Sequence, residues 1–200
     1  TYPVMGYVET LEACLSHPHY KAPLKKLQGR GYASGFWFNA GGESSAQVNI
    51  TEDGNVVVTT GHPDIGGSRA SIANITAELL GIDVNRVSVL IGDTASIGFS
   101  NLTGGSRVLF ASALVVTEST NQVIDILKDR ASKIWNIDKE AIEWENGEAR
   151  PAGDNAGKFK PLSLVELAEQ ATPTGGPIGA GHQVNTVGAE GGFATHICDV

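Results

Sequence analysis

The first 28 residues carry one short helical pattern followed by a loop. Over residues 7–15 the apolar side chains recur with the spacing of one helix face, at Val8, Leu11 and Leu15. The stretch 16–28 contains Pro18 and Pro23, which interrupt regular structure. We therefore expect residues 1–28 to form a connector rather than a domain.

From Gly31 the pattern changes to that of β-strands. Residues 32–39 are aromatic or small, and the next stretch alternates polar residues with Ala46, Val48 and Ile50. Asp53 and Gly54 then give a strong turn signal before the three valines at 56–58. This order of residues predicts a hairpin of two antiparallel strands.

Two longer helices are predicted further along the chain. The first covers residues 68–80 and ends at Gly81; its apolar stripe consists of Ile72, Ile75, Leu79 and Leu80. A strand over 87–91 follows it. The second helix covers residues 106–135, and its first half, 108–116, is apolar almost all round. We expect the first three turns of this helix to be buried.

The character of the sequence changes after Ile137. The elements predicted there are two short strands, a helix and a glycine-rich stretch, over residues 141–144, 148–150, 163–171 and 175–181. We place a soft boundary near residue 137, which divides the chain into a subdomain over 29–137 and a second α+β subdomain over 138–200. Strands and helices mixed with hairpins predict an α+β fold.

Both ends of the chain have the character of cut sites. Residues 187–200 are strand-like and stop without a turn, a cap or a polar tail, and the chain starts at Thr1 without an initiator Met. We expect the chain to be a fragment of a longer polypeptide, with its second subdomain truncated at the C-terminal end.

Composition narrows the class of protein. The chain has 200 residues, 41% of them hydrophobic and 18% charged, which is typical of a globular protein with a real core. Its formal net charge is -8, and Lys and Arg are scattered apart from residues 21–30, so we expect no nucleic-acid partner. No apolar run reaches 18 residues, so we expect no membrane span and a cytoplasmic location, with the periplasm as the alternative.

Cysteine and histidine give no metal site. Cys14 and Cys198 lie almost the whole chain apart and outside any CxxC pair, so we expect two reduced packing residues. His17 and His19 flank Pro18 with no third ligand nearby, and a solvated loop is the better interpretation.

One tetrapeptide occurs twice in equivalent places. Gly66-Gly67-Ser68-Arg69 recurs as Gly104-Gly105-Ser106-Arg107, each time between a predicted strand and a predicted helix. A helix N-terminus has unpaired N–H groups and a partial positive charge, and glycine lets the backbone approach an anion closely. The serines would cap the helices or donate a hydroxyl, and the arginines would add charge. Two such loops side by side predict a site for a ligand that carries a pyrophosphate.

Other interpretations of the repeat stay open. A single Gly-Gly-Ser is most often a turn with a serine cap, and the arginines have alternative partners in Asp64 and Asp93. The sequence contains neither GxxxxGK[ST] nor GxGxxG, which excludes the two common nucleotide loops.

At these residues the sequence resembles the molybdopterin-binding large subunit of the xanthine dehydrogenase and aldehyde oxidase family, the molybdenum hydroxylases. The resemblance covers nearly the whole chain. It rests on segments that follow in the family's order and approximate spacing: Gly31–Asn39, Val48–Val58, Gly61–Arg69, Gly92–Thr94 and Thr103–Arg107.

The resemblance implies that this fragment binds molybdopterin through residues 66–69 and 103–107. The implied contact residues are Gly66, Gly67, Ser68, Arg69, Thr103, Gly104, Gly105, Ser106 and Arg107. The family often has Gln at the position of Gly67, so no side-chain contact from residue 67 to the metal end is expected, whereas backbone contacts are.

The resemblance also implies an oxidoreductase that acts on aldehydes, N-heterocycles or similar small substrates. Its partners would be the rest of the large subunit and iron-sulfur and FAD subunits or domains. The family's glutamate base is not recognised here: Glu190 only superficially resembles it, because its flanks belong to a strand. We therefore assign no catalytic residue, expect the fragment alone to be inactive and not to retain the cofactor, and keep a non-catalytic phosphate- or nucleotide-binding module as the alternative.

Overall fold

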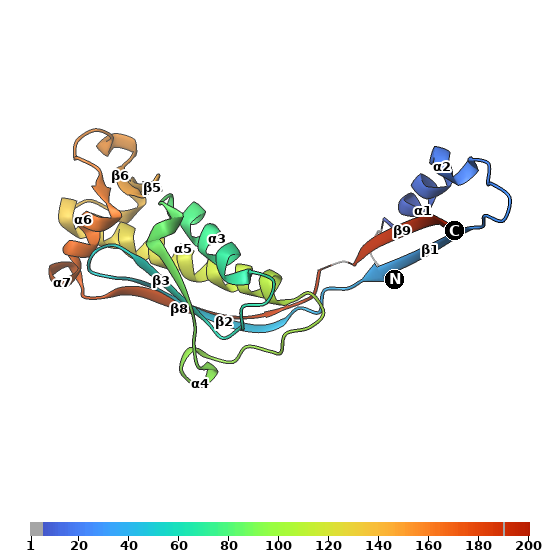
Figure 1. Cartoon of the computed structure of the whole chain (residues 1–200). Coiled ribbons are helices and arrows are strands. Elements are labelled where there is room, and N and C mark those ends of the chain that lie inside the picture. Colours follow the sequence, from blue (N-terminus) through green and yellow to red (C-terminus); the bar gives the residue numbers. More distant parts are fainter. Residues whose placement is uncertain (1–5, 190) are drawn as a thin grey trace.

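A four-stranded mixed sheet forms the base of the larger of two lobes. The computed structural model describes residues 6–189 and 191–200, and Figure 1 shows the sheet at the left. Its strand order is β4-β3-β2-β8, with bounds Val87–Ile91, Val56–Thr60, Gly42–Ile50 and Ile178–Thr186. β2 pairs antiparallel with β3 and β8, whereas β3 and β4 are parallel. The predicted hairpin is confirmed.

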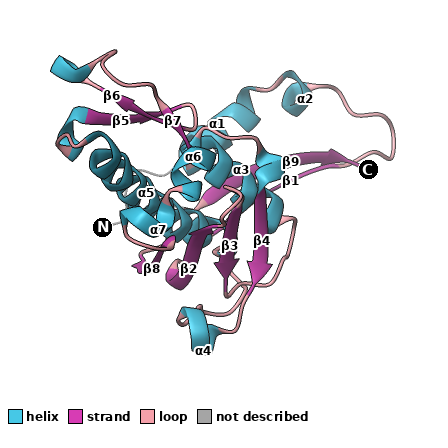
Figure 2. Cartoon of the chain, turned by 90° about the vertical axis from the view of Figure 1, so that its left-hand side faces the viewer, coloured by secondary structure: helices cyan, strands magenta, loops and turns pink. Residues whose placement is uncertain are grey.

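Two helices cover one face of this sheet, as Figure 2 shows. α3 (Ser68–Leu80) is the crossover from β3 to the 3-10 turn η1 (Val84–Arg86) and β4, and α5 (Val108–Trp135) packs on α3, β2 and β8. Alternate strand residues, such as Val48, Val56 and Val58, meet buried residues of the helices, such as Ile72, Val115 and Leu127. The one-sided core follows from the period-two alternation of the strands.

A small sheet and two short helices close the far end of α5. The strands are β5 (Ile142–Glu145), β6 (Glu148–Pro151) and β7 (Leu162–Ser163); the helices are α6 (Leu164–Glu169) and α7 (Ala171–Thr174). Two 3-10 turns, η2 (Lys139–Ala141) and η3 (Gly153–Asn155), connect them. α6 begins with a capping box, in which the Ser163 hydroxyl accepts from the Glu166 amide and the Glu166 carboxylate accepts from the Ser163 amide.

The smaller lobe is an arm of two strands and two helices (Figure 1). β1 (Arg30–Trp37) pairs antiparallel with β9 (Gly192–Asp199), and α1 (Tyr7–Ser16) packs on β9 and is followed by α2 (Pro18–Lys21). The arm joins the large lobe through the β1–β2 and β8–β9 connections. A Cβ added at Gly188 would lie 1.8 Å from the Asn39 carbonyl oxygen, so the two connections run in direct contact.

The α+β fold predicted from the sequence is confirmed. Two local expectations were wrong: the loop 16–28 contains the short helix α2, and the glycine-rich stretch at 175–181 leads into strand β8. Residues 94–97 form the short helix α4, for which no element was predicted. The division near residue 137 stays a prediction, and β8, from beyond it, joins the sheet of β2.

The first turns of α5 are not buried all round. Ala111, Val115 and Val116 are buried, but Leu109 and Leu114 are about two-fifths exposed, at 43% and 42%. The reason is geometric: α5 lies on the sheet with one face, and residues on its opposite face point away from sheet and α3 alike.

Candidate functional site

Loop 1, defined as residues 61–67, connects β3 to the N-terminus of α3. Gly66 and Gly67 both have left-handed backbone conformations, with φ of 69° and 76°. A Cβ at either glycine would meet no atom within 4 Å, so both face open space. The amides of Gly66, Gly67 and Ser68 have no hydrogen-bond partner within residues 6–189 and 191–200. These amides are free to receive an anion at the positive end of α3.

Asp64 and Arg69 form an ion pair across loop 1. The Asp64 carboxylate accepts from the Arg69 amide at 3.1 Å, from Arg69 Nε at 3.0 Å and from the Ser68 hydroxyl at 3.3 Å. The backbone and side-chain hydrogen bonds from Arg69, in that order, hold the pKa of Asp64 below its usual range. Asp64, which was expected as an alternative partner of Arg69, is therefore its ion-pair partner in the structure.

Loop 2, defined as residues 98–107, leads from the short helix α4 (Thr94–Ile97) to α5. Gly105 and Ser106 have positive φ values of 62° and 56°. The Gly105 carbonyl accepts from the Ala40 amide at 2.9 Å, and a Cβ at Gly105 would lie 2.8 Å from the Ala40 Cβ. Gly105 is thus required by packing against the β1–β2 connection.

Arg107 is buried, and its guanidinium donates hydrogen bonds to loop 2, to β2 and to the β1–β2 connection. Its guanidinium donates to the carbonyl oxygens of Asn101 at 2.9 Å and Leu102 at 3.2 Å, and also to those of Gly41 and Glu43. Burial lowers the pKa of Arg107, partly offset by Glu43. Its role in the geometry is to fix the path of loop 2.

The two copies of the tetrapeptide are therefore not structurally equivalent. Neither serine caps its helix: the N-cap residues are Gly67 for α3 and Arg107 for α5, without a side-chain capping bond. Arg69 is half exposed in an ion pair, whereas Arg107 is buried among carbonyls. Thr103 and Gly104 are exposed on loop 2.

The structure does bring the two loops together. Both helices start at the end of the large lobe that faces the arm, as Figure 1 shows. A Cβ at Gly61 in loop 1 would lie 2.8 Å from the Ser100 hydroxyl oxygen in loop 2. Ser44 on β2, which sequence patterns did not single out, hydrogen-bonds to both His62 and Arg107. Only the long-range contact reveals Ser44, since its sequence neighbourhood carries no motif.

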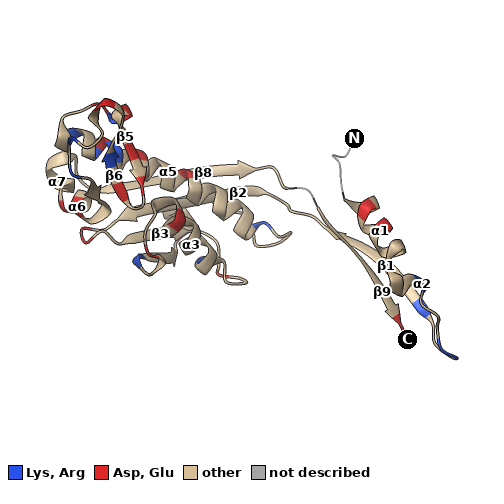
Figure 3. Cartoon of the chain, turned by 90° about the horizontal axis from the view of Figure 1, so that it is seen from above, with Lys and Arg blue, Asp and Glu red and all other residues tan. Residues whose placement is uncertain are grey.

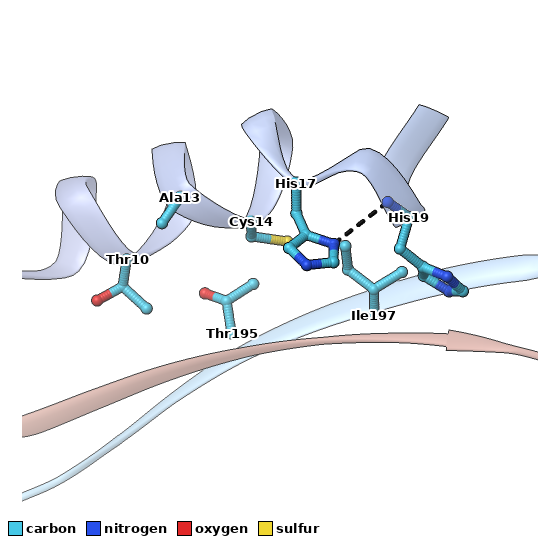
Figure 4. A pocket seen from close by; sticks show the side chains of 7 residues that line it. All are labelled: Thr10, Ala13, Cys14, His17, His19, Thr195 and Ile197. Carbon is cyan, nitrogen blue, oxygen red and sulfur yellow. Dashed lines mark hydrogen bonds between the residues drawn. The ribbon is translucent and has the colours of Figure 1, made fainter. Parts of the chain in front are cut away.

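Two hollows of the described chain lie away from both loops. One, of about 530 Å³, lies between α1 and β9 and is lined by Cys14, His17 and Thr195 among others (Figure 4). The other, of about 1070 Å³, lies between the β2–β3 turn and α7. Within residues 6–189 and 191–200 no cluster of three His, Cys, Asp or Glu side chains has metal-binding geometry. Glu190 lies outside the described residues.

Figure 3 shows Lys and Arg scattered among Asp and Glu, without a continuous basic stripe along the ribbon. Among the helices of the described chain, none combines the length and apolar character needed to cross a membrane.

Comparison with known proteins gives a match over most of the chain. A family model for the "Molybdopterin cofactor-binding domain" matches residues 16–200. The chain is 40% identical over 70 residues to the aldehyde oxidoreductase molybdenum-binding subunit PaoC of Escherichia coli strain K12. This matched segment covers 34% of the chain and 10% of that protein. It is 28% identical over 103 residues to aldehyde oxidase 1 of Macaca fascicularis, covering 51% of the chain and 8% of that protein.

Solved structures share the fold. A Cu,Mo-CO dehydrogenase superposes with a TM-score of 0.74 at 18% identity, over 96% of this chain and 26% of that one. Quinoline 2-oxidoreductase from Pseudomonas putida 86 gives 0.71 at 20% identity, over 86% and 25%. The chain thus spans a tenth or less of these curated relatives and about a quarter of these structures.

Proposed function

The chain belongs to the molybdopterin cofactor-binding domain family, and from this premise we propose that loops 1 and 2 bind the phosphate end of that cofactor. One observation carries the proposal: at the N-terminus of α3 the amides of Gly66, Gly67 and Ser68 have no hydrogen-bond partner among the described residues, and a Cβ at Gly66 or Gly67 would meet open space. An anion placed there gains hydrogen bonds and the attraction of the helix dipole together.

The proposed contacts divide into two groups. At the end of loop 1 and the start of α3, Gly66, Gly67 and Ser68 would present backbone amides to the anion. In loop 2, the contacts would come from Thr103, Gly104, Gly105 and Ser106. Arg69 and Arg107 belong to the same site, with Arg69 adding charge beside Asp64 and Arg107 holding the loop 2 backbone in place.

For the whole protein we propose an oxidoreductase that acts on an aldehyde, an N-heterocycle or a similar small substrate. Molybdopterin, when bound, supplies the metal at which substrate is oxidised. Iron-sulfur and FAD subunits or domains, together with the rest of the large subunit, are the proposed partners. Support comes from family membership and the likeness to PaoC. A non-catalytic phosphate- or nucleotide-binding module finds no support in the comparisons.

The experiment compares two glycines with the same backbone demand. Gly67 and Gly157 both have positive φ, 76° and 74°, and at both a Cβ would meet nothing within 4 Å. Valine at either position introduces similar strain, about 1 kcal/mol or more. We expect pyrophosphate added to the chain to shift the NMR amide signals of residues 66–68 and 103–106, and Gly67→Val to weaken this binding about tenfold through loss of close approach.

Gly157→Val serves as the control, and should lower the melting temperature similarly while leaving pyrophosphate binding unchanged. Equal binding by the folded Gly67→Val variant, or wild-type shifts that miss both loops, would contradict the proposal. Gly105→Val is unsuitable for this test, because its Cβ would collide with Ala40 and confound binding with folding.

A further inference from the structure

Three buried polar side chains connect loop 1 to loop 2 across β2. His62, Ser44 and Arg107 have exposed fractions of 2%, 1% and 2%. His62 Nε2 lies 2.8 Å from the Ser44 hydroxyl oxygen, which in turn lies 3.2 Å from Arg107 Nη2. Because His62 belongs to loop 1 and Arg107 to loop 2, Ser44 is the middle member of a hydrogen-bond chain between the loops.

The hydrogen bonds of Ser44 favour one tautomer of His62. A guanidinium only donates, so Ser44 Oγ accepts from Arg107. The Ser44 proton then has one acceptor among the described residues, His62 Nε2. This favours a neutral imidazole with its proton on Nδ1, because the other tautomer would leave the Ser44 proton without an acceptor. Nδ1 is buried without a hydrogen-bond partner in the described chain, so Ser44 is the one hydrogen-bond partner of the imidazole there.

The surroundings of His62 favour the neutral form. Burial, and secondarily the positive charge of Arg107, lower the pKa of His62 to about 4. The carboxylates that neighbour Ser44 and His62 in the sequence are engaged elsewhere: Glu43 accepts from Asn101 at 3.0 Å, and Asp64 is paired with Arg69. No carboxylate contacts the ring to favour its cation within residues 6–189 and 191–200.

We propose that neutral His62 is a positioning residue that couples the placement of loop 1 to that of loop 2 through Ser44 and Arg107. The coupling is a property of the chain's own contacts. Its consequence, that the two loops meet a shared ligand in one fixed register, rests on the proposed function.

The test measures hydrogen exchange of the amides of residues 100–107, which belong to loop 2, in the protein without ligand. His62→Leu removes the acceptor, and Ser44→Ala removes the middle member. We expect each to speed exchange in loop 2 about tenfold, although neither substitution lies in that loop. His62→Gln, whose amide oxygen can accept from Ser44 in place of Nε2, should restore wild-type protection. The exchange rate of loop 2 in the double variant His62→Leu with Ser44→Ala should exceed that of neither single variant, because both substitutions break the same series of hydrogen bonds.

A pH series separates coupling from general stability. In the wild type, loop 2 exchange corrected for the intrinsic rate should rise as the pH falls from 6 to about 4, since protonated His62 no longer accepts from Ser44. His62→Gln should lack this rise, although it keeps every carboxylate. Ser112→Ala, which removes a buried α5 hydroxyl that makes no hydrogen bond within the described residues, should leave loop 2 unchanged.

Two outcomes would overturn the proposal: unchanged loop 2 exchange in Ser44→Ala, or a uniform rise over β2, β3 and α5 that exceeds the change in loop 2. If His62→Leu fails to fold, Ser44→Ala and the pH series decide the matter. Because no ligand is present, the result is independent of whether pyrophosphate binds. Intact coupling without pyrophosphate binding would count against the proposed function alone.

Discussion

Arginine shows how one residue type serves two purposes in the same motif. Arg69 lies half exposed beside Asp64 at the open loop 1, while Arg107 lies buried among the carbonyl oxygens of loop 2 and β2. The sequence repeat predicted both loops and their places before helices. It could not predict this asymmetry, because the carbonyl acceptors of Arg107 lie on the β1–β2 connection, β2 and loop 2 and converge only in the folded chain. The burial of His62 and Ser44 could not be predicted either, because these residues also meet only in the folded chain.

The buried imidazole of His62 makes stability depend on pH. Its pKa is about 4 in the folded chain and 6.5 ordinarily, so the unfolded chain binds the proton more tightly. The contribution of neutral His62 to the free energy of unfolding is therefore fully present above pH 6.5 and is lost as the pH drops from 6.5 to 4. This pKa shift corresponds to a contribution of about 3 kcal/mol.

Urea unfolding of the wild type and His62→Gln at several pH values checks this prediction. The difference between the two unfolding free energies should change across the window from pH 6.5 to 4 and level off below it. A difference that stays constant would show that His62 titrates normally.

At the scale of elements, helix α5 shows what periodicity predicts and what it misses. Its helical character was predicted to within two residues of either end, and so were α3 and β4, because each has a clear period and a stop signal. The all-apolar stretch 108–116 left open which side faces the core. Packing on the sheet decided this, and it turned Leu109 and Leu114 outward. β8 was missed because Gly179 and Gly181 mask a strand that β2 stabilises by pairing.

Two leucines of α5 provide a matched test of this orientation. Leu127 is fully buried and Leu114 is 42% exposed. Leu127→Ala should lower the free energy of unfolding by about 2–5 kcal/mol, since it leaves a cavity in the core. Leu114→Ala should cost below about 1 kcal/mol. Chemical denaturation of both variants measures the pair, and equal losses would mean that the outer face of α5 is covered in solution.

At the scale of the whole molecule, the two lobes differ in how much apolar surface they bury. The large lobe has a continuous core between the four-stranded sheet, α3 and α5. In the arm, α1, α2, β1 and β9 together contribute one buried residue among those described, Cys14, which is 8% exposed. Tyr32, Phe36 and Trp37 of β1 are each more than three-fifths exposed. A two-stranded sheet with so little burial is marginally stable.

The arm is instead fastened by polar contacts at its outer end. Arg30 donates to both carboxylate oxygens of Asp199, at 2.6 and 2.8 Å, and to the carbonyl oxygens of Tyr20 and Ala22 at 2.7 and 2.8 Å. These bonds join β1, β9 and α2, and the hydrogen bonds from Arg30 to the Asp199 carboxylate hold the pKa of Asp199 below its usual range. We infer that the hydrogen bonds of Arg30 stabilise the arm where a larger apolar core is missing among the described residues.

The last prediction follows from this division: the arm opens as a unit, and at a lower free energy than the large lobe. Hydrogen exchange should be faster in β1 and β9 than in β2 and β3, although all four are paired strands. Arg30→Gln should speed exchange throughout β1 and β9, because it breaks the contacts to Asp199 and to the α2 segment together. The same substitution should leave β2, β3 and α5 unchanged, since in the described part of the chain the lobes are joined through the β1–β2 and β8–β9 connections. Lys139→Gln, which removes the surface ion pair with Asp125 at the end of α5, is the control and should leave the arm unaffected. A rise that spreads equally into the large lobe would show that the two lobes unfold together.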